Sequence, residues 1–565
     1  MRSFCTICTA SVQVPYKKGL YRNIGKLTPL RQNLSSARVS ELKALTTKID
    51  ETQKNLSTLS PDHRELGIQQ ELFTTSKFCP GTPIFLPNGT KIFNKLIEYL
   101  RCQYEVFGFQ EVLTPTIFKK SLWETSGHWD NYAEDMYAVT GRRTLRVQDG
   151  ETEVQDEPYG LKPMNCPCHC LIFASKGRSY RDLPLRYADF SSLHRNEVAG
   201  ALSGLTRVKR FHQDDGHIFC RPSQIKGEIR RTLDFVKLTY EVLGLGPYRL
   251  VLSTRPSSGF IGTEEEWDNA ELALKESLDA SGLVWKVNEG DGAFYGPKID
   301  IILQSSADKK EHQTATIQLD FQLPKRFGLR YQAPAPEVEK KGLVCTDSSL
   351  LSVEGPVTPV LIHRAVLGSV ERIMALLIEH YNGHWPFWLN PNQAAIITVN
   401  DSPEILEYAG EVGRALQGLG KIDSDQASRQ SERGIPRDLA SISVEVFDKP
   451  IGVNHKIAAA KRQRYGIIVL IGPKEVQSGT ISVDLSGIPI RNRYTDKILQ
   501  MASTKANQYI PGQDMKWEVL EYKSDSTSSL NDYSQPSVSP RLRDRLSVTT
   551  TFLRSIMLEL LKTYS

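Results

Sequence analysis

The sequence predicts an α+β domain of strands and amphipathic helices, followed by a smaller α/β domain. Two observations predict the first domain. "DGAFYGPKIDIIL" and "TATIQLDFQLP" are β-rich runs that end near turn residues or proline, and helical spacing of apolar residues recurs over 224–243 and 263–282. A third observation predicts the second domain, because short apolar strands alternate with helix-like segments after residue 389.

The composition is that of an ordinary globular protein. A chain of 565 residues, 40% hydrophobic and 24% charged, is long enough for two or more domains with their own cores. No apolar run approaches the roughly 20 residues that cross a bilayer, so no membrane partner is expected. Nine scattered cysteines do not form a disulfide framework and favour a reducing compartment.

Basic residues are concentrated at the N-terminus. Residues 1–40 hold seven Lys or Arg and no acid before Glu41, which leaves 63 basic against 65 acidic residues in the rest of the chain. This balance excludes a uniformly basic nucleic-acid binder, so any RNA contact must be a local patch. The Arg-rich, Ser/Thr-rich and acid-free stretch predicts an organellar transit peptide over 1–40; a plain basic tail is the alternative.

The first domain is expected over 76–388, after a polar linker or short helix at 41–75. Ile92, Leu96 and Leu100 recur at helical spacing before a stop at Gly108, and "FQEVLTP" then predicts a strand. Strands with turns follow, among them a hairpin with "QDGETEVQDEP" at its tip.

The segment "HRAVLGSVERIMALLIEHY" predicts an amphipathic helix, with Val366, Val370, Ile373 and Leu377 on one stripe. A boundary follows at 382–393. The second domain, 389–565, alternates the strands "AAIITVN", "ISVEVFD" and "GIIVLIG" with helices at 403–418 and 455–464, and ends in a helix near 545–563. The Ser-rich stretch 523–541 is predicted to be a disordered insertion.

The stretch "PMNCPCHC", Pro163 to Cys170, suggests a metal or redox site. In an extended chain the three alternating cysteines would point one way and His169 the other. A structural zinc site normally needs a second Cys-x-x-Cys pair, and the sequence has none apart from Cys5 and Cys8 in the basic N-terminal stretch, so a self-contained zinc knuckle is not expected. The open question is whether one cysteine is completed by distant ligands.

Phosphate binding, if present, must use side chains, because neither a Gly-x4-Gly-Lys-Ser/Thr loop nor a Gly-x-Gly-x-x-Gly turn occurs. Arginine suits this task through its planar, bidentate fork. Arg195 in "LHRNE" and Arg207 in "LTRVKRFHQDDGHIF" flank one polar loop, and Arg372 follows in the predicted helix. Each could instead be a surface ion-pair partner.

Several long motifs resemble a known family. "FGFQEVLTP", "SSLHRNEVAGALSGLTRVKRFHQDDGHIFC" and "PVLIHRAVLGSVERI" resemble motifs 1, 2 and 3 of class II aminoacyl-tRNA synthetases, and "KPMNCPCHCLIF" and "GAFYGPKIDI" resemble the threonyl-tRNA synthetases. The resemblance implies a catalytic domain built on an antiparallel β-sheet flanked by helices, followed by an anticodon-binding domain. It implies activation of L-threonine with ATP and transfer to tRNA(Thr).

The resemblance also implies one zinc ion held by three matching residues, Cys166, His217 and His363. Three protein ligands leave a fourth position open, as in catalytic rather than structural zinc sites. Cys168 stands where the family usually has glycine, and we expect neither Cys168 nor Cys170 to be a ligand; an altered loop conformation is the expected cost. The residues expected to contact threonine are Met164, Arg195, Gln213, Asp215 and Tyr295.

The same resemblance implies a nucleotide-binding site, with Mg2+ on the phosphates of ATP. The expected ATP-binding residues are Arg195, Glu197, Arg207, Phe211, Gln318 and Arg372. Arg195 and Arg372 are expected to act in the activation step, and His128 and Lys298 in transfer to tRNA. For His128 a purely structural hydrogen bond beside Trp129 is the alternative.

The family further implies a homodimer and, with the N-terminal stretch, a mitochondrial form that works in the matrix. Only about 75 residues precede the core, so an N-terminal editing domain is not expected in this chain. RNA contacts could come from the basic cluster Lys456, Lys461, Arg462 and Arg464, although a solvated face explains it equally well. The rival hypotheses are a seryl- or prolyl-tRNA synthetase and a catalytically dead, synthetase-like binding module.

Overall fold

The computed structural model describes residues 62–140, 145–148, 151–154, 158–304, 311–419, 442–489, 493–507 and 545–562. The predicted transit peptide at 1–40 and the Ser-rich stretch at 523–541 lie outside these residues. Among the described helices, none is both long and apolar enough to cross a bilayer.

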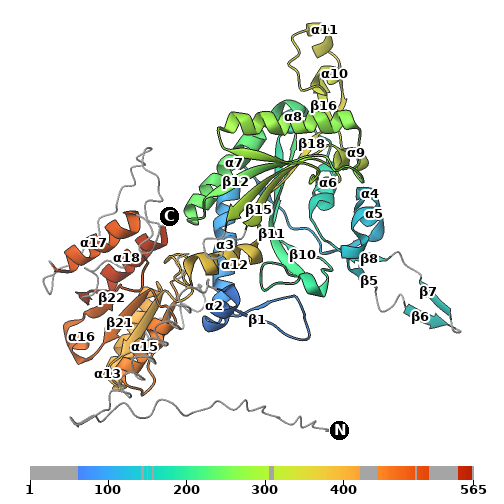
Figure 1. Cartoon of the computed structure of the whole chain (residues 1–565). Coiled ribbons are helices and arrows are strands. Elements are labelled where there is room, and N and C mark those ends of the chain that lie inside the picture. The colour runs from blue at the N-terminus through green and yellow to red at the C-terminus, as the bar shows by residue number, and fades with distance from the viewer. Residues whose placement is uncertain are drawn as a thin grey trace, which may run out of the picture. The chain divides into compact units, whose positions relative to one another are not determined.

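A nine-stranded, mainly antiparallel sheet forms the centre of the first domain (Figure 1). Its order is β13 (Trp285–Asn288), β12 (Tyr248–Ser253), β14 (Lys298–Gln304), β15 (Glu311–Asp320), β18 (Val360–Ser369), β11 (Arg210–Cys220), β9 (Leu185–Asp189) and β3 (Gln110–Glu111), with β10 (Ser192–His194) paired to β11. The predicted pairing of "KIDIIL" with "TATIQLDF" is confirmed as β14–β15. The antiparallel sheet predicted from the resemblance is therefore present.

One face of this sheet carries the main hydrophobic core, shared with α3 (Pro87–Val106), α7 (Ile225–Val242), α8 (Glu264–Ser281) and α12 (Val370–Tyr381). The predicted helix stripe is confirmed, because Ile92, Leu96 and Leu100 are all buried in this core. Successive residues of a strand alternate between faces, so the opposite face is free to carry polar side chains.

The register of the strands places four polar side chains in one row on this opposite face. Lys298 pairs with Gln318, Gln318 with His363, and His363 with His217, across β14, β15, β18 and β11. Directly opposed residues on neighbouring strands point to the same face, with Cβ atoms about 5 Å apart. The sheet thus gathers residues separated by more than a hundred positions in the sequence.

The predicted helix over 363–381 is partly wrong. Residues up to Ser369 belong to β18, which is buried on both sides between β11 and β15, and α12 begins only at Val370. A short apolar run buried on both faces does not distinguish strand from helix. The chain turns at Gly368, with φ +70°, where an added Cβ would lie 2.4 Å from the Thr314 carbonyl oxygen. Ser369 then caps α12 by accepting from the Arg372 amide.

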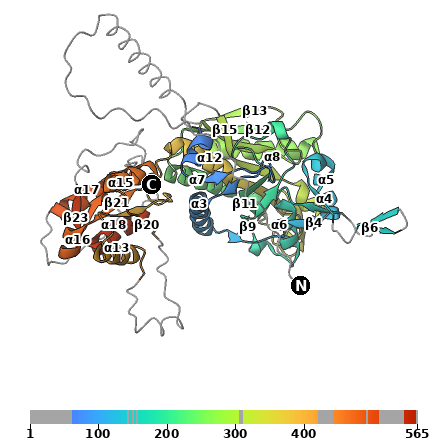
Figure 2. The ribbon, with the colours of Figure 1, turned by 90° about the horizontal axis from the view of Figure 1, so that it is seen from below.

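The stretch "CPCHC" is helical, so the alternation of side chains that an extended chain would give does not apply. Helix α6 (Cys166–Ala174) begins at Cys166 with Pro167 in its first turn, where proline is tolerated. Cys166 and Cys170 are one turn apart and pack with Phe173 against the sheet, beside β9 and β11 (Figure 2). Cys168 adopts this helical conformation too and has no positive φ, so the backbone here does not require glycine; the altered loop conformation stays a prediction.

Shorter elements complete the first domain. They are α2 (His63–Gln69), β1 (Phe73–Thr74), β2 (Ile84–Phe85), β4 (Ile117–Lys119), α4 (Lys120–Ser126), α5 (His128–Tyr132), η1 (Ala133–Asp135), β5 (Ala138–Val139), β6 (Leu145–Gln148), β7 (Glu151–Val154), β8 (Tyr159–Leu161), η2 (Tyr180–Asp182), η3 (Ala199–Ala201), η4 (Pro222–Gln224), α9 (Gln322–Arg326), β16 (Tyr331–Pro334), α10 (Pro336–Glu339), α11 (Ser348–Leu351) and β17 (Glu354–Val357). The predicted hairpin is confirmed as β6–β7, although β7 lies within the residues assigned to its tip. Helix α2 lies within the predicted linker.

The hairpin β16–β17, with α10 between its strands, is anchored by a partly buried ion pair. Arg221 Nε and Nη2 each lie 2.6 Å from a carboxylate oxygen of Glu339, which also accepts from the Tyr331 hydroxyl at 2.8 Å. Glu339 is 5% exposed, so losing its partner would leave a buried acceptor unsatisfied.

We therefore expect Arg221→Ala to lower the free energy of unfolding by about 1–3 kcal/mol. Thermal unfolding followed by fluorescence measures the effect. The exposed Arg249–Glu311 pair offers the matched control, because exposed pairs contribute about 1 kcal/mol or less. Equal losses of unfolding free energy in Arg221→Ala and Arg249→Ala would contradict the conclusion that the Arg221–Glu339 pair anchors this hairpin.

The second domain has the predicted α/β architecture. Its five-stranded sheet has the order β20 (Val444–Phe447), β19 (Ala394–Thr398), β21 (Ile467–Ile471), β22 (Ile481–Asp484) and β23 (Leu546–Val548). Its helices are α13 (Pro403–Leu416), α15 (Val453–Arg462), α16 (Pro473–Ser478), α17 (Arg493–Asn507) and α18 (Thr550–Lys562). Lys456 does not fit the proposed RNA contact, because it is 1% exposed and its amine donates to the Thr398 carbonyl and hydroxyl.

Candidate active site

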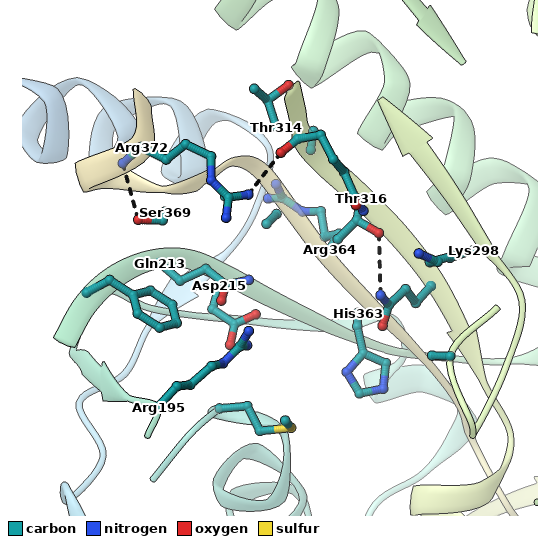
Figure 3. A pocket seen from close by; sticks show the side chains of 18 of the residues that line it. Arg195, Gln213, Asp215, Lys298, Thr314, Thr316, His363, Arg364, Ser369 and Arg372 are labelled. Carbon is teal, nitrogen blue, oxygen red and sulfur yellow. Dashed lines mark hydrogen bonds between the residues drawn. The ribbon is translucent and has the colours of Figure 1, made fainter. Parts of the chain in front are cut away.

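A cavity of about 530 Å³ opens on the polar face of the central sheet. Its size is typical of small-molecule sites. Every residue predicted to bind metal, threonine or ATP lines it, and so does Lys298; His128 does not. Figure 3 shows Arg195, Gln213 and Asp215 on one side of this cavity and Lys298 and His363 on the other.

The three predicted metal ligands meet at the buried end of the cavity. One ligand atom each from Cys166, His217 and His363 lies within 4.8 Å of the others, and all three side chains are buried. His217 and His363 face each other directly, with Nε2 and Nδ1 3.0 Å apart. Helix α6 supplies the cysteine, and two adjacent strands supply the histidines.

The surroundings of these residues fit a zinc ion. Asp320 Oδ2 lies 2.8 Å from His363 Nε2, which assigns the proton to Nε2 and turns the Nδ1 lone pair toward His217. Burial lowers the pKa of His217 well below its usual value, so its imidazole is neutral. Burial raises the pKa of the Cys166 thiol well above its usual value, so a thiolate here requires a cation beside it. One thiolate and two neutral imidazoles are a preferred zinc donor set.

The predicted threonine-contacting residues surround this cluster. Asp215, two positions before His217 on β11, is buried and accepts from Asn165 Nδ2 at 3.1 Å; burial raises its pKa. The hydroxyl of Tyr295 donates to Gln318 Oε1. Arg195, Gln213 and Met164 complete the wall of the cavity. A carboxylate, an amide and a guanidinium within one small cavity can bind the polar groups of an amino acid.

Three arginines give the outer part of the cavity its positive charge. The Arg195 guanidinium lies 5.1 Å from the Phe211 ring centre, and its buried Nε has no hydrogen-bond partner. Arg207 pairs with Glu197 at 2.7 Å. The pKa of Arg372 is lowered by burial and then by Arg195 and Arg207 nearby, as expected where cations outnumber carboxylates. Such a site favours a polyanion such as a nucleoside triphosphate.

Arg372 joins two walls of the cavity. Its Nε donates to the Thr206 carbonyl at 3.0 Å, and its Nη1 donates to the Gln313 carbonyl at 3.1 Å. The first bond thus fixes the loop that carries Arg207. The second, drawn as a dashed line from Arg372 in Figure 3, fixes β15.

Lys298 is held by two carboxylates at the cavity wall. Its amine lies 3.0 Å from Asp300 and 3.2 Å from Asp291. Burial alone would lower the pKa of Lys298, but the two carboxylates raise it, so the amine stays protonated. Asp300 also accepts from Gln313 Nε2 and the Thr316 hydroxyl, which links Lys298 to β15.

His128 lies behind the metal cluster. Its ring is fully buried, its Nδ1 is 2.7 Å from the Ser126 hydroxyl, and its Nε2 is 3.9 Å from Cys166 Sγ. Burial lowers its pKa to about 3, far from the operating pH that suits a general base. Its role in transfer to tRNA stays a prediction.

Asn165, Asp300 and Asp320 support the site and were not singled out from the sequence. Each lies next to a predicted residue: Asn165 precedes Cys166, Asp300 lies two positions after Lys298, and Asp320 two after Gln318. Because residues two apart in a strand share a face, period-two spacing could have identified both aspartates.

Comparison with known proteins decides the family. Residues 149–381 match the tRNA synthetase class II core domain family (G, H, P, S and T), and residues 393–502 match the anticodon binding domain family. A relative from Schizosaccharomyces pombe, named "Probable threonine--tRNA ligase, mitochondrial", is 47% identical over 77% of this chain and 86% of its own. The chain belongs to the threonine–tRNA ligase family. The mitochondrial threonine–tRNA ligase of Saccharomyces cerevisiae is 45% identical over 75% of this chain and 87% of its own.

A solved structure of the same family has the same fold. The RNA binding domain of threonyl-tRNA synthetase from Cryptosporidium parvum Iowa II has a TM-score of 0.62 and 41% identity, over 75% of this chain and 92% of its own. Prolyl-tRNA synthetase from that organism shares only the fold, at 14% identity and a TM-score of 0.51. The predicted resemblance to threonine–tRNA ligases is therefore confirmed, and the seryl or prolyl alternative is not.

Proposed function

We propose that this chain activates L-threonine with ATP and transfers it to tRNA(Thr), using the cavity around Cys166, His217 and His363. The observation that supports this proposal most strongly is the meeting of three buried metal-ligating side chains with Asp215 and three arginines in one cavity. A dead, synthetase-like module has no need of this complete set.

Activation requires threonine's carboxylate to attack the α-phosphate of ATP. Arg195, with its unpaired buried Nε, would bind the α-phosphate and the carboxylate and stabilise the charge that develops between them. Arg207 would bind the γ-phosphate, and the adenine would lie between Phe211 and Arg372, with Glu197 at its amino group. Gln318 would position the nucleotide, and Mg2+ would accompany the phosphates.

Threonine is selected by groups that face its hydroxyl and amino groups. A zinc ion held by Cys166, His217 and His363 would supply a Lewis-acidic position open to both. Asp215 would orient the hydroxyl and Tyr295 the amino group, Gln213 and Arg195 would bind the carboxylate, and Met164 lines the same cavity. Valine leaves the buried Asp215 without a hydroxyl partner, and a site built for a hydroxyl rejects such an analogue by about 10⁴-fold or more.

The transfer step has two proposed participants, Lys298 and His128, which differ in access. Lys298 lines the cavity as a fixed ammonium and can bind an anionic or ribose oxygen there. His128 would have to act from behind Cys166, which makes it the weaker of the two assignments on geometry.

The proposal is tested by ATP–pyrophosphate exchange on purified, zinc-loaded protein with threonine, serine and valine. We expect strong exchange with threonine and negligible exchange with valine. Serine should support weaker exchange, because one missing methyl changes selectivity by roughly 10–200-fold. No exchange with any of the three would overturn the proposal and favour the binding module.

The cellular setting follows from the same family. We infer that the protein works in the mitochondrial matrix, as a homodimer, on the basis of mitochondrial relatives and of the family's motif 1. Import of the full chain into isolated mitochondria and light scattering of the purified protein test the two inferences separately.

A further inference from the structure

Residues that precede the catalytic core are bonded directly to the loop that carries Arg207. Helix α2 places His63 between two elements that are far from it in sequence. Its Nδ1 lies 2.7 Å from Glu379 Oε1 on α12, and the amide of Leu205 donates to its Nε2 at 3.2 Å. His63 is 5% exposed, so water competes little for either bond.

The loop 203–209 is shaped around this histidine. Gly204 has φ +48°, and a Cβ there would lie 2.1 Å from His63 Nε2, so only glycine permits this approach. Leu205 is fully buried in the main core. The Lys209 amide donates to the Gly81 carbonyl at 2.8 Å, so the loop is held at Leu205 by His63 and at Lys209 by Gly81.

The position of this loop determines where two of the cavity's arginines, Arg207 and Arg372, lie. Thr206, next to Leu205, offers its carbonyl to Arg372 Nε at 3.0 Å. Arg207 follows in the chain and reaches the cavity beside Glu197. A loop released at Leu205 would therefore free the backbone acceptor of Arg372 and move Arg207 at the same time.

The hydrogen bonds assign the tautomer of His63. Because the Leu205 amide is a donor, Nε2 must offer a lone pair, and the proton lies on Nδ1, which donates to Glu379. Asp62, His63 and Glu379 have the spacing of a metal site. However, the protonated Nδ1 has no lone pair to offer a metal, and Arg64 Nε lies 3.0 Å from both Asp62 oxygens. These contacts support a bridge between protein segments rather than a ligand site.

We propose that His63 is a positioning residue for ATP. Anchored by Glu379, its neutral imidazole holds the Leu205 amide and thereby the loop that presents Thr206 to Arg372 and Arg207 to the nucleotide. This inference rests on the proposed nucleotide site. It assigns a role in ATP binding to a segment that the family's core match, residues 149–381, does not include.

Two substitutions separate the two contacts of His63. In His63→Gln the amide oxygen can take the place of Nε2 and accept from Leu205. In His63→Asn the shorter side chain can place its amide nitrogen at Nδ1 and donate to Glu379, but it cannot reach the loop. Arg64→Ala is the control, since Arg64 is exposed on the same helix and bonds to Asp62.

We expect His63→Asn to raise the KM for ATP about 3- to 10-fold, the effect of one hydrogen bond, with the KM for threonine changed less than about twofold. The Leu205 amide should exchange faster with deuterium in this variant. His63→Gln and Arg64→Ala should resemble the wild type in both measurements. If His63→Asn does not fold, Gly204→Ala breaks the same contact from the loop side and should raise the KM for ATP alone.

Equal KM values for ATP in the Gln and Asn variants would overturn the proposal, as would equal rises for ATP and threonine. A failure of the proposed function would appear differently, as a wild-type protein without exchange activity. Amide exchange at Leu205 needs no activity, so unchanged protection in His63→Asn would overturn the inference even then.

Discussion

Cys166→Ala is expected to lose threonine-dependent ATP–pyrophosphate exchange by on the order of 10³-fold or more. Two histidines remain in this variant, and a buried pair of imidazoles lacks the third protein ligand that zinc sites of this kind require. The zinc content of the purified variant, measured by mass spectrometry, should fall from about one per chain to near zero.

Cys170 provides the matched control. It lies one turn further along α6, is equally buried and belongs to the same apolar cluster, but it is not part of the metal cluster. Cys170→Ala should keep both zinc and exchange activity. Cys168→Gly should also remain active, with a stability loss of about 1–2 kcal/mol because it places glycine in a helix and removes a buried side chain. Zinc loss in Cys170→Ala but not in Cys166→Ala would reverse the ligand assignment.

Arg195→Lys should lower kcat for threonine activation by about 10²–10³-fold. Lysine keeps the charge but not the planar fork that can bind carboxylate and phosphate oxygens together, nor the stacking on Phe211. Because the lost contact forms mainly in the transition state, KM for threonine should change much less than kcat. Steady-state exchange at varied threonine and ATP separates the two constants.

The same substitution at Arg249, which is exposed and pairs with Glu311, should leave kcat unchanged. A kcat within threefold of the wild type for Arg195→Lys would mean that charge alone suffices, and the assignment of the α-phosphate contact would fail.

The candidate site could be predicted far better from the sequence than its local structure. Residues as distant as Met164 and Arg372 line one cavity. They could be named from the sequence because family motifs identify them regardless of how the chain folds between them. Strand pairing, by contrast, depends on neighbours. The apolar run before Ser369 fits a helical stripe in isolation, and only the flanking strands β11 and β15 make it a central strand.

The supporting contacts were the least predictable. The placement of His63 beside Leu205 and Glu379 joins segments more than a hundred residues apart, and no local pattern around His63 indicates either partner. The helix at Cys166 was missed because a nine-residue run with three cysteines and a proline has weak helical periodicity. Its packing against the sheet stabilises it instead.

Zinc-edge X-ray absorption of the purified protein tests the central claim most directly, because it counts sulfur and nitrogen ligands. One sulfur at about 2.3 Å and two imidazole nitrogens at about 2.0–2.1 Å are predicted. Added threonine should change the light-atom coordination, whereas valine at the same concentration should not. No sulfur ligand, or two or more from the cysteines of α6, would contradict a site built from Cys166, His217 and His363.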